Sequence, residues 1–180
     1  MSLIIAGSTS GTITLDTPAV AGTNTATLPA ATGTVMVSGN QPAFSAYLSS
    51  SQSIGSGSLT KMQCNTKEFD TASAYDNATN YRFTPQVAGY YQVSGGAQLN
   101  YTSGSLSSFI CIYKNGSAFK FGSNTMNTNV YQLVMVSALI YLNGSTDYVE
   151  MYAQQNSGGS ANIGGNQNTS YFQAVMVRSA

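Results

Sequence analysis

Charged residues are scarce in this chain of 180 residues. Lys, Arg, Asp and Glu together make up 7% of it, and six basic residues balance six acidic ones, so the formal net charge is zero. Soluble domains usually carry about a quarter charged residues. A neutral chain lacks the positive surface that holds nucleic acid or an anionic membrane, and we expect neither as a partner. So little charge also protects poorly against self-association, which suits a subunit of a permanent assembly.

Histidine and tryptophan are absent. The lack of histidine removes the commonest general base and the commonest zinc ligand, so we expect no enzyme, no catalytic residues and no bound cofactor. Glu68 and Asp70 stand at alternate positions, as the carboxylate pair of a glycoside hydrolase would, but the sparse acidic residues argue against that interpretation. Asp70, Asp76 and Asn77 are weak candidates for calcium ligands, and capping of turns by the same side chains is favoured.

Long hydrophobic runs are absent too. No apolar run of about 18 residues occurs, so no transmembrane helix is expected. The segment from Met1 to Gly7 lacks the basic start and the long apolar core of a secretion signal. The two cysteines, Cys64 and Cys111, lie in alternating, strand-like runs, and we expect both to be small buried residues. A disulfide between them is the alternative, because spacing in the sequence does not show proximity.

What the chain does contain is 42% hydrophobic residues, 12 tyrosines and many small polar residues. That apolar content can offset the entropy lost on folding, which argues against disorder. Alternation of apolar and polar residues predominates, and helical periodicity is almost absent. The pattern predicts an all-β head of about ten antiparallel strands, nine of them at residues 43–48, 59–64, 80–84, 89–101, 107–113, 118–121, 131–142, 147–153 and 170–177.

Turns and one unusual strand add detail. Asn115-Gly116 accepts the positive φ angles of a type I′ hairpin turn, and Asn143-Gly144 carries the same signal between two long strands. Strands joined by short turns indicate a sandwich or jelly roll. Residues 131–142 read YQLVMVSALIYL, with apolar residues on both faces. In an antiparallel protein this implies that the outer face of the strand meets another subunit.

Residues 1–40 differ from the rest of the chain. They contain no aromatic residue and are rich in Thr and Ala. Ile13 and Leu15 alternate with threonines as they would in a strand, but a segment this short cannot close a core alone. We therefore predict an extended N-terminal β arm or stalk at residues 1–40, which needs partner chains, and a folded head at residues 41–180.

The head contains a segment that closely resembles the C1q domain. It reads FDTASAYD from Phe69 to Asp76 and YRFTPQVAGYYQV from Tyr81 to Val93. The family pattern is F-D, then Y-D or Y-N, then F-x-P-x-x-G-x-Y, and its positions fall on Phe69, Asp70, Tyr75, Asp76, Phe83, Pro85, Gly89 and Tyr91. The closing segment 171–177 is similar to the last strand of the family, with Ala174 where glycine is usual. The resemblance implies a C1q/TNF-like jelly-roll sandwich over residues 41–180.

The physical chemistry of the motif can be read directly. Pro85 cannot donate a ladder hydrogen bond and should end a strand, while Gly89 should permit the turn into the next one. Tyr90 and Tyr91 should then point to opposite faces of the sheet, so that one fills the core and the other meets a neighbouring subunit.

The resemblance further implies a homotrimer, because C1q and TNF domains assemble around a three-fold axis. We expect the trimer interface to include Tyr91, Val134, Val136, Tyr141 and Phe172.

Residues 11–35 read GTITLDTPAVAGTNTATLPAATGTV and resemble a recurrent segment of bacteriophage tail-fibre and other virion proteins. With a C1q-like head, this resemblance implies a structural protein of the virion, assembled in the host cytoplasm. One hypothesis is a trimeric capsid decoration or cement protein that binds the major capsid protein. The alternative is a small tail-fibre tip that binds tail proteins and host-surface glycans or proteins. In that case exposed tyrosines such as Tyr101 or Tyr131 could stack on sugars.

Overall fold

The computed structural model describes residues 3–16, 18–20, 22–25, 30, 37, 41–100, 106–126 and 131–180. The chain divides into two compact units, Met1–Gly33 and Thr34–Ala180. The head predicted from residue 41 onward lies within the second unit. The described residues contain no helix with the length and hydrophobicity needed to cross a bilayer.

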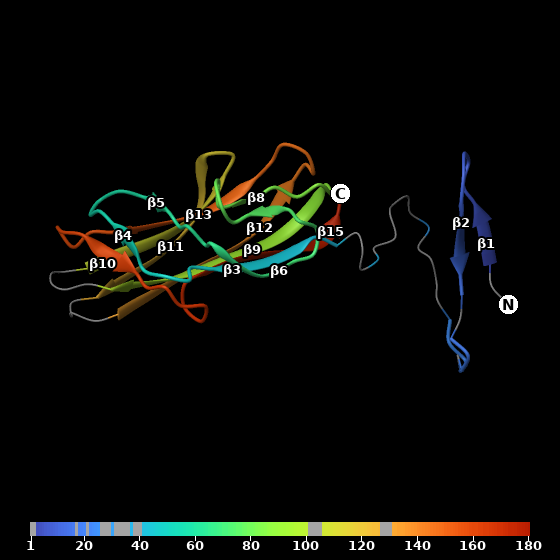
Figure 1. Ribbon diagram of the computed structural model, residues 1–180, viewed down its shortest axis with the longest axis horizontal. Helices are drawn as coiled ribbons and strands as arrows, with labels where there is room; N and C mark the ends of the chain where they lie inside the picture. The colour runs from blue at the N-terminus through green and yellow to red at the C-terminus, as the bar shows by residue number, and fades with distance from the viewer. Residues whose placement is uncertain are drawn as a thin grey trace. The chain divides into compact units, whose positions relative to one another are not determined.

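The first unit contains a β-hairpin (Figure 1). Strands β1 (Leu3–Ala6) and β2 (Thr12–Leu15) pair antiparallel, with Leu3 opposite Leu15 and Ile5 opposite Ile13. The amide of Gly7 donates a hydrogen bond of 2.9 Å to the carbonyl of Gly11 and closes the turn. Residues 3–15 of the predicted arm therefore form a β-hairpin.

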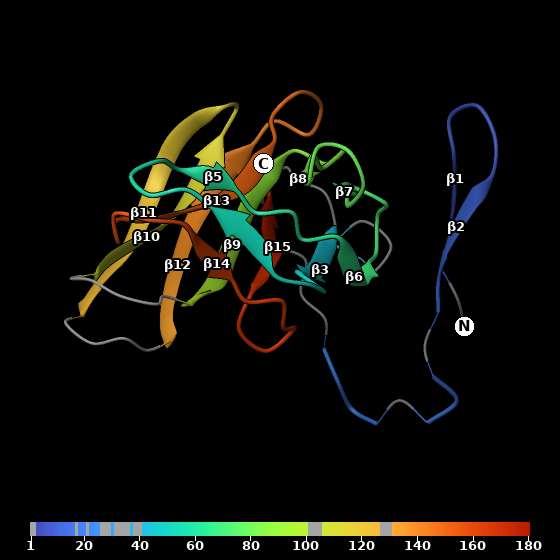
Figure 2. The same cartoon turned by 60° about the vertical axis from the view of Figure 1, so that its left-hand side comes forward.

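The second unit is a sandwich of two sheets whose strand pairs are antiparallel (Figure 2). In the described residues, the larger sheet contains seven strands: β3 (Ala43–Tyr47), β4 (Gln52–Ile54), β6 (Thr66–Asp70), β9 (Gly89–Asn100), β12 (Tyr131–Leu142), β14 (Ala161–Ile163) and β15 (Tyr171–Ser179). The smaller sheet contains six: β5 (Thr60–Lys61), β7 (Tyr75–Asp76), β8 (Arg82–Phe83), β10 (Leu106–Lys114), β11 (Ser117–Met126) and β13 (Val149–Gln155). The all-β prediction is confirmed.

Strand β9 organises the larger sheet. Along one edge it pairs over its full length with β12, and along the other it pairs with β15 and then with β14. Strand β3 lies beside β15, and β6 lies beyond β3. In the smaller sheet β13 is central, with β10 and β11 on one side and the short strands β5 and β8 on the other.

An aromatic cluster fills the space between the sheets. Phe44 is 1% exposed, and its ring centroid lies 4.5 Å from that of Tyr75, 4.6 Å from that of Phe83 and 4.9 Å from that of Phe172. Tyr91 packs edge-on against Phe83, with the ring centroids 5.6 Å apart. Most of the aromatic residues that carry the C1q resemblance are therefore core residues, which stabilise the fold through buried area and ring contacts.

Three predicted turn features had different outcomes. Asn115 and Gly116 have φ angles of 51° and 77°, which confirms the tight turn between β10 and β11. The hairpin implied by Asn143-Gly144 is wrong, because β12 and β13 belong to different sheets and the loop crosses between them. Gly89 does not make a turn: it is the first residue of β9, and a side chain there would collide with the carbonyl of Arg178 on β15.

Candidate interface on the outer face of the larger sheet

Strand β12 is apolar on both faces, as its sequence predicts. Val134, Val136 and Ile140 point into the core, where each is at most 7% exposed. The alternate side chains point outward, and the exposed apolar ones among them are Tyr131 (72%), Leu133 (46%), Met135 (58%), Leu139 (56%) and Tyr141 (43%). Large apolar side chains that line a whole strand on the solvent side are typical of an interaction surface.

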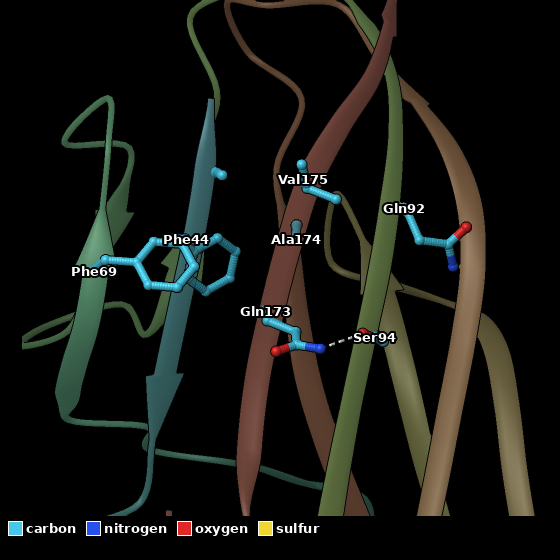
Figure 3. A pocket seen from close by; sticks show the side chains of 8 residues that line it. Phe44, Phe69, Gln92, Ser94, Gln173, Ala174 and Val175 are labelled. Carbon is cyan, nitrogen blue, oxygen red and sulfur yellow. Dashed lines mark hydrogen bonds between the residues drawn. The ribbon is translucent and has the colours of Figure 1, made fainter. Parts of the chain in front are cut away.

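The apolar surface continues across the neighbouring strands. Tyr90 of β9 lies directly opposite Tyr141 of β12, and their ring centroids are 5.5 Å apart. Val175 and Val177 of β15 are 46% and 57% exposed. Phe69 of β6 is 51% exposed. We call the outward surface of β12, β9, β15, β3 and β6 the outer face; one part of it is drawn in Figure 3.

The centre of the outer face is polar but uncharged. Gln92 donates a hydrogen bond of 2.6 Å from Nε2 to Oγ of Ser137. Gln173 donates one of 3.1 Å from Nε2 to Oγ of Ser94 (Figure 3). Strands β9 and β12 contain no charged residue. Neutral groups that already bond to one another lose less on burial than charged groups, so a partner can cover this surface at low cost.

Two hollows lie next to each other on the outer face. One, of about 290 Å³, is lined by Ala43, Phe44, Phe69, Gln92, Ser94, Gln173, Ala174 and Val175 (Figure 3). The other, of about 440 Å³, is lined by Ser94, Met135, Val136, Ser137, Tyr171 and Gln173. Because both include Ser94 and Gln173, the surface is a pair of adjoining depressions with apolar rims. Such a shape can receive side chains of a second protein surface.

The structure corrects four of the five residues predicted for the trimer interface. Tyr91, Val134, Val136 and Phe172 are at most 7% exposed and lie inside the core of the single chain. Of these four residues, Val136 borders the hollow of about 440 Å³, and the other three are buried between the sheets. Tyr141 is the fifth, and it does lie on the outer face. The prediction was wrong because residues two apart share a face of a strand, so Val134 and Val136 both point inward.

Sequence reasoning missed most of the outward residues of this surface. Leu133, Met135 and Leu139 are each an even number of residues from Tyr141, so they lie on the same face of the strand and could have been grouped with it. The prediction for Tyr90 and Tyr91 is confirmed in its first part: they point to opposite faces, with Tyr91 in the core and Tyr90 40% exposed on the outer face.

The calcium candidates Asp70 and Asp76 serve two separate turns. The carboxylate of Asp70 accepts hydrogen bonds of 3.0 and 3.1 Å from the amides of Ala74 and Tyr75, and it forms an ion pair of 3.2 Å with Lys67. The described residues contain no cluster of three or more His, Cys, Asp or Glu side chains that could hold a metal ion. Glu68, the other member of the proposed carboxylate pair, accepts a hydrogen bond of 2.6 Å from Ser45.

Asp76 caps the turn that follows it. Its carboxylate accepts hydrogen bonds of 3.0 Å from the backbone amides of Thr79, Ala78 and Asn80, which hold the pKa of the carboxyl well below its ordinary value. Asn77 points elsewhere and donates from Nδ2 to the carbonyl of Asn65 at 2.8 Å. This geometry is the turn capping that the sequence favoured over calcium binding.

The cysteines and the sugar-stacking tyrosines can also be placed. Cys64 and Cys111 are both 0% exposed and unbonded to each other, which confirms them as buried free thiols. Tyr131 is 72% exposed at the start of β12. Tyr101 lies outside the described residues.

Comparison with solved structures identifies the class of fold. The chain is similar to Eiger TNF from S. frugiperda, with a TM-score of 0.58 and 10% identity over 78% of this chain and 93% of that one. It is similar to the globular domain of zebrafish complement 1qA, with a TM-score of 0.55 and 17% identity over 78% and 99% of the two chains. Murine APRIL gives a TM-score of 0.57 and 8% identity over 76% and 99%.

The head is therefore a TNF/C1q-like jelly roll, as its sequence motif implied. At these identities the similarity shows the fold alone. No protein-family model matches the chain, and no curated protein matches it in sequence.

Proposed function

We propose that the protein is a homotrimeric structural subunit of a bacteriophage particle, which decorates the capsid and stabilises it by surface burial without catalysis. The observation that carries the first half of this proposal is the outer face: it has large exposed apolar side chains along β12, and its strands β9 and β12 contain no charged residue. Its partner is a second copy of the chain. A standard interface buries about 800 Å² on each side and is depleted of charge at its centre, and the outer face has that composition.

The C1q/TNF-like fold supports three copies rather than two. The motif that resembles the C1q domain implies assembly around a three-fold axis. In such a trimer each copy would contribute its outer face to the common centre, and the hollows beside Ser94 and Gln173 would receive side chains of a neighbour. Charged residues are absent from β9 and β12, so like charges would not repel one another on these two strands at the axis.

The virion assignment depends on residues 1–40. Their resemblance to a segment of phage tail-fibre and virion proteins supports a place in a phage particle, and the β-hairpin at the start of the chain supports a role in attachment. We favour decoration of the major capsid protein over a fibre tip, because a compact head that bears a small separate hairpin unit suits repeated contacts on a shell. Many weak, identical contacts then act together on the shell.

A matched pair of substitutions tests the trimer. Leu139 on the outer face and Phe121 on β11 of the smaller sheet are each 56% exposed. Light scattering of the unaltered chain should give about three times the chain mass of 18.8 kDa. Leu139→Asp should give monomers, because it would place a carboxylate in an apolar interface. Phe121→Asp should leave the trimer intact. A monomeric unaltered chain, or equal effects of the two variants, would contradict the proposed interface.

Particles that lack the protein test the place of the trimer. We expect them to assemble, to burst at lower temperature or under milder osmotic shock, and to adsorb normally to host cells. The stabilisation should follow the occupancy of the shell, because the trimer binds the assembled lattice. Unchanged stability together with lost adsorption would favour the fibre-tip alternative. Deleting residues 1–40 should leave a trimeric head that no longer attaches.

A further inference from the structure

The outward side of the smaller sheet differs in chemistry from the outer face of the larger sheet. Val149 and Met151 of β13 are 0% exposed core residues, so Glu150 and Tyr152, which alternate with them, point outward. Their backbone partners on the neighbouring strands extend two adjacent rows across the sheet. One row contains Tyr113, Glu150 and Arg82, and the other contains Phe121, Cys111, Tyr152 and Lys61. We call the outward side chains of these two rows the platform.

Aromatic rings form one half of the platform. Tyr113 and Tyr152 stack on each other, with ring centroids 3.9 Å apart and an angle of 21° between the ring planes. Phe121 of β11 lies opposite Cys111, on the other side of that cysteine from Tyr152, and it is 56% exposed. The face of an aromatic ring carries partial negative charge and attracts polarised C–H groups. This half of the platform therefore suits a ligand with a flat apolar face.

Arg82 provides unused hydrogen-bond donors in the other half. Two carboxylates lie opposite it in the register, those of Glu150 and Asp76, but both are bonded elsewhere. Glu150 accepts a hydrogen bond of 2.5 Å from Nζ of Lys61, and Asp76 accepts from the backbone amides of its own turn. Within the part of the chain that the structure describes, the guanidinium of Arg82 forms neither an ion pair nor a hydrogen bond, and it stacks on the ring of Tyr148 at 4.5 Å. Its five N–H donors remain for a ligand.

The backbone before Arg82 adopts a conformation that bulky residues avoid. Tyr81 has a φ angle of 50°, in the left-handed region that favours glycine and asparagine. Such a conformation persists only where the surroundings impose it, and it is found often at binding sites. Tyr81 directly precedes the residue whose donors are unused. The strain therefore supports a binding role for Arg82 over a purely structural one.

The charges of the platform select its occupant. Lys61 and Arg82 balance Glu150 and the neighbouring Asp76, so no net positive field draws nucleic acid or another polyanion to it. A second protein surface is also disfavoured, because protein interfaces are depleted of charge at their centre, whereas Glu150 lies on the central strand between Tyr113 and Arg82. A neutral sugar fits both halves: its C–H face stacks on a ring, and its hydroxyl groups accept hydrogen bonds from the guanidinium.

We propose that the platform binds a neutral glycan, with one sugar ring on Phe121 and the hydroxyl groups of another sugar unit on Arg82. These two residues lie on β11 and β8, which are three strand spacings or about 14 Å apart across the sheet. One sugar ring does not cover that distance, so the ligand is an oligosaccharide or a polysaccharide. The site goes beyond the proposed function: it lies within a single chain, and it depends neither on the trimer nor on the shell.

Biolayer interferometry of the full-length chain over immobilised polysaccharides tests the platform. The neutral panel contains dextran, mannan, galactan, rhamnan and glycol chitin, and polygalacturonate is the acidic counterpart. We expect at least one neutral polysaccharide to bind the chain, and to bind it more tightly than polygalacturonate does. Raising the salt concentration from about 0.05 to about 0.5 M should change the Kd less than about twofold, because the ligand carries no charge to be screened. Because the full-length chain is used, the measurement includes any cover that the first unit provides.

Paired variants locate the binding site. Arg82→Gln and Phe121→Ser should each raise the Kd about tenfold or more, with a melting temperature close to that of the unaltered chain. Arg178→Gln is the matched control, because Arg178 of the larger sheet also lies beside a tyrosine ring, that of Tyr90 at 5.9 Å. It should leave the Kd unchanged. Light scattering of each variant should give the mass of the unaltered chain, so that a change in association does not alter the apparent affinity.

The outcomes separate this proposal from the proposed function. It is overturned if no neutral polysaccharide binds, if polygalacturonate binds more tightly, or if Arg82→Gln and Arg178→Gln have equal Kd values. Loss of binding in Tyr131→Ser, with binding retained in both platform variants, would place the glycan on the outer face and would also refute it. A monomeric chain that binds a neutral glycan through Arg82 and Phe121 would support the platform while the proposed trimer fails. A trimeric chain without glycan binding would give the opposite result.

Discussion

Replacing Phe44 by alanine should remove much of the stability of the head. Phe44 is 1% exposed and contacts the rings of Tyr75, Phe83 and Phe172 at centroid distances of 4.5–4.9 Å. Core Phe-to-Ala changes cost about 3–5 kcal/mol. Aromatic pairs add about 0.5–1.5 kcal/mol beyond buried area, so we expect the upper part of that range, about 4–5 kcal/mol. For a domain of this size that corresponds to a melting temperature about 10–20 °C lower.

Urea denaturation followed by tyrosine fluorescence or circular dichroism would measure the loss. The measurement should be made at two protein concentrations, because association of the native state adds a concentration-dependent contribution. Phe69→Ala is the matched control: Phe69 borders the same hollow but is 51% exposed on the outer face. It should cost less than about 1 kcal/mol in the monomer, since exposed side chains away from special features change stability little. A loss below about 2 kcal/mol for Phe44→Ala would refute the assignment of this ring cluster as the centre of the core.

Three more predictions follow from single residues. Hydrogen bonds to the carboxylate of Asp76 hold its pKa below the ordinary value. The carboxylate therefore stabilises the fold above about pH 4, and this contribution is lost as the pH falls further. Asp76→Asn should make the melting temperature less dependent on pH at the acid end, as measured by thermal melting. Burial raises the pKa of Cys64 to about 12 and raises that of Cys111, so neither thiol should react with a chromogenic disulfide reagent at pH 8 until denaturant is added. Gly144 has a φ of 71° and packs against the backbone of Ala88. Gly144→Ala should therefore lower the free energy of unfolding, measured by urea denaturation, by at least about 1 kcal/mol. An unchanged free energy of unfolding would show that the loop can move.

The long strands of the head could be predicted from the sequence, and the short ones could not. Residues 89–101 and 131–142 were predicted as strands, and the structure has Gly89–Asn100 and Tyr131–Leu142. Strands β4, β6, β7 and β14 were missed. They are two to five residues long, and β6 reads TKEFD, whose mostly exposed side chains show no apolar alternation. Their pairing depends on neighbouring strands that are distant in the sequence, so local pattern cannot reveal it.

The existence of an outer apolar surface was predictable, but its residues were not. Apolar residues on both faces of 131–142 indicated an apolar inner surface and an apolar outer surface. The sequence could not show which of the two alternating sets of side chains faces the core, because Val134 in one set and Leu133 in the other are both strongly hydrophobic. The register of β12 against β9 decides it: Val136 lies opposite Gly95, and both belong to the inner side. A one-residue slip of that register would exchange the two faces.

The position of β15 in the sheet has a consequence for the order of folding. This strand contains residues 171–179 and follows every other described strand in the sequence, yet it lies between β3 and β9, which are synthesised earlier. Until the ribosome has delivered β15, β3 and β9 face an empty slot with unpaired backbone edges. Such non-local pairing folds slowly, and its open edges invite misassociation. The nascent head should therefore depend on chaperone binding or on fast completion, and the subunits of the proposed trimer should recognise one another only after β15 has been synthesised.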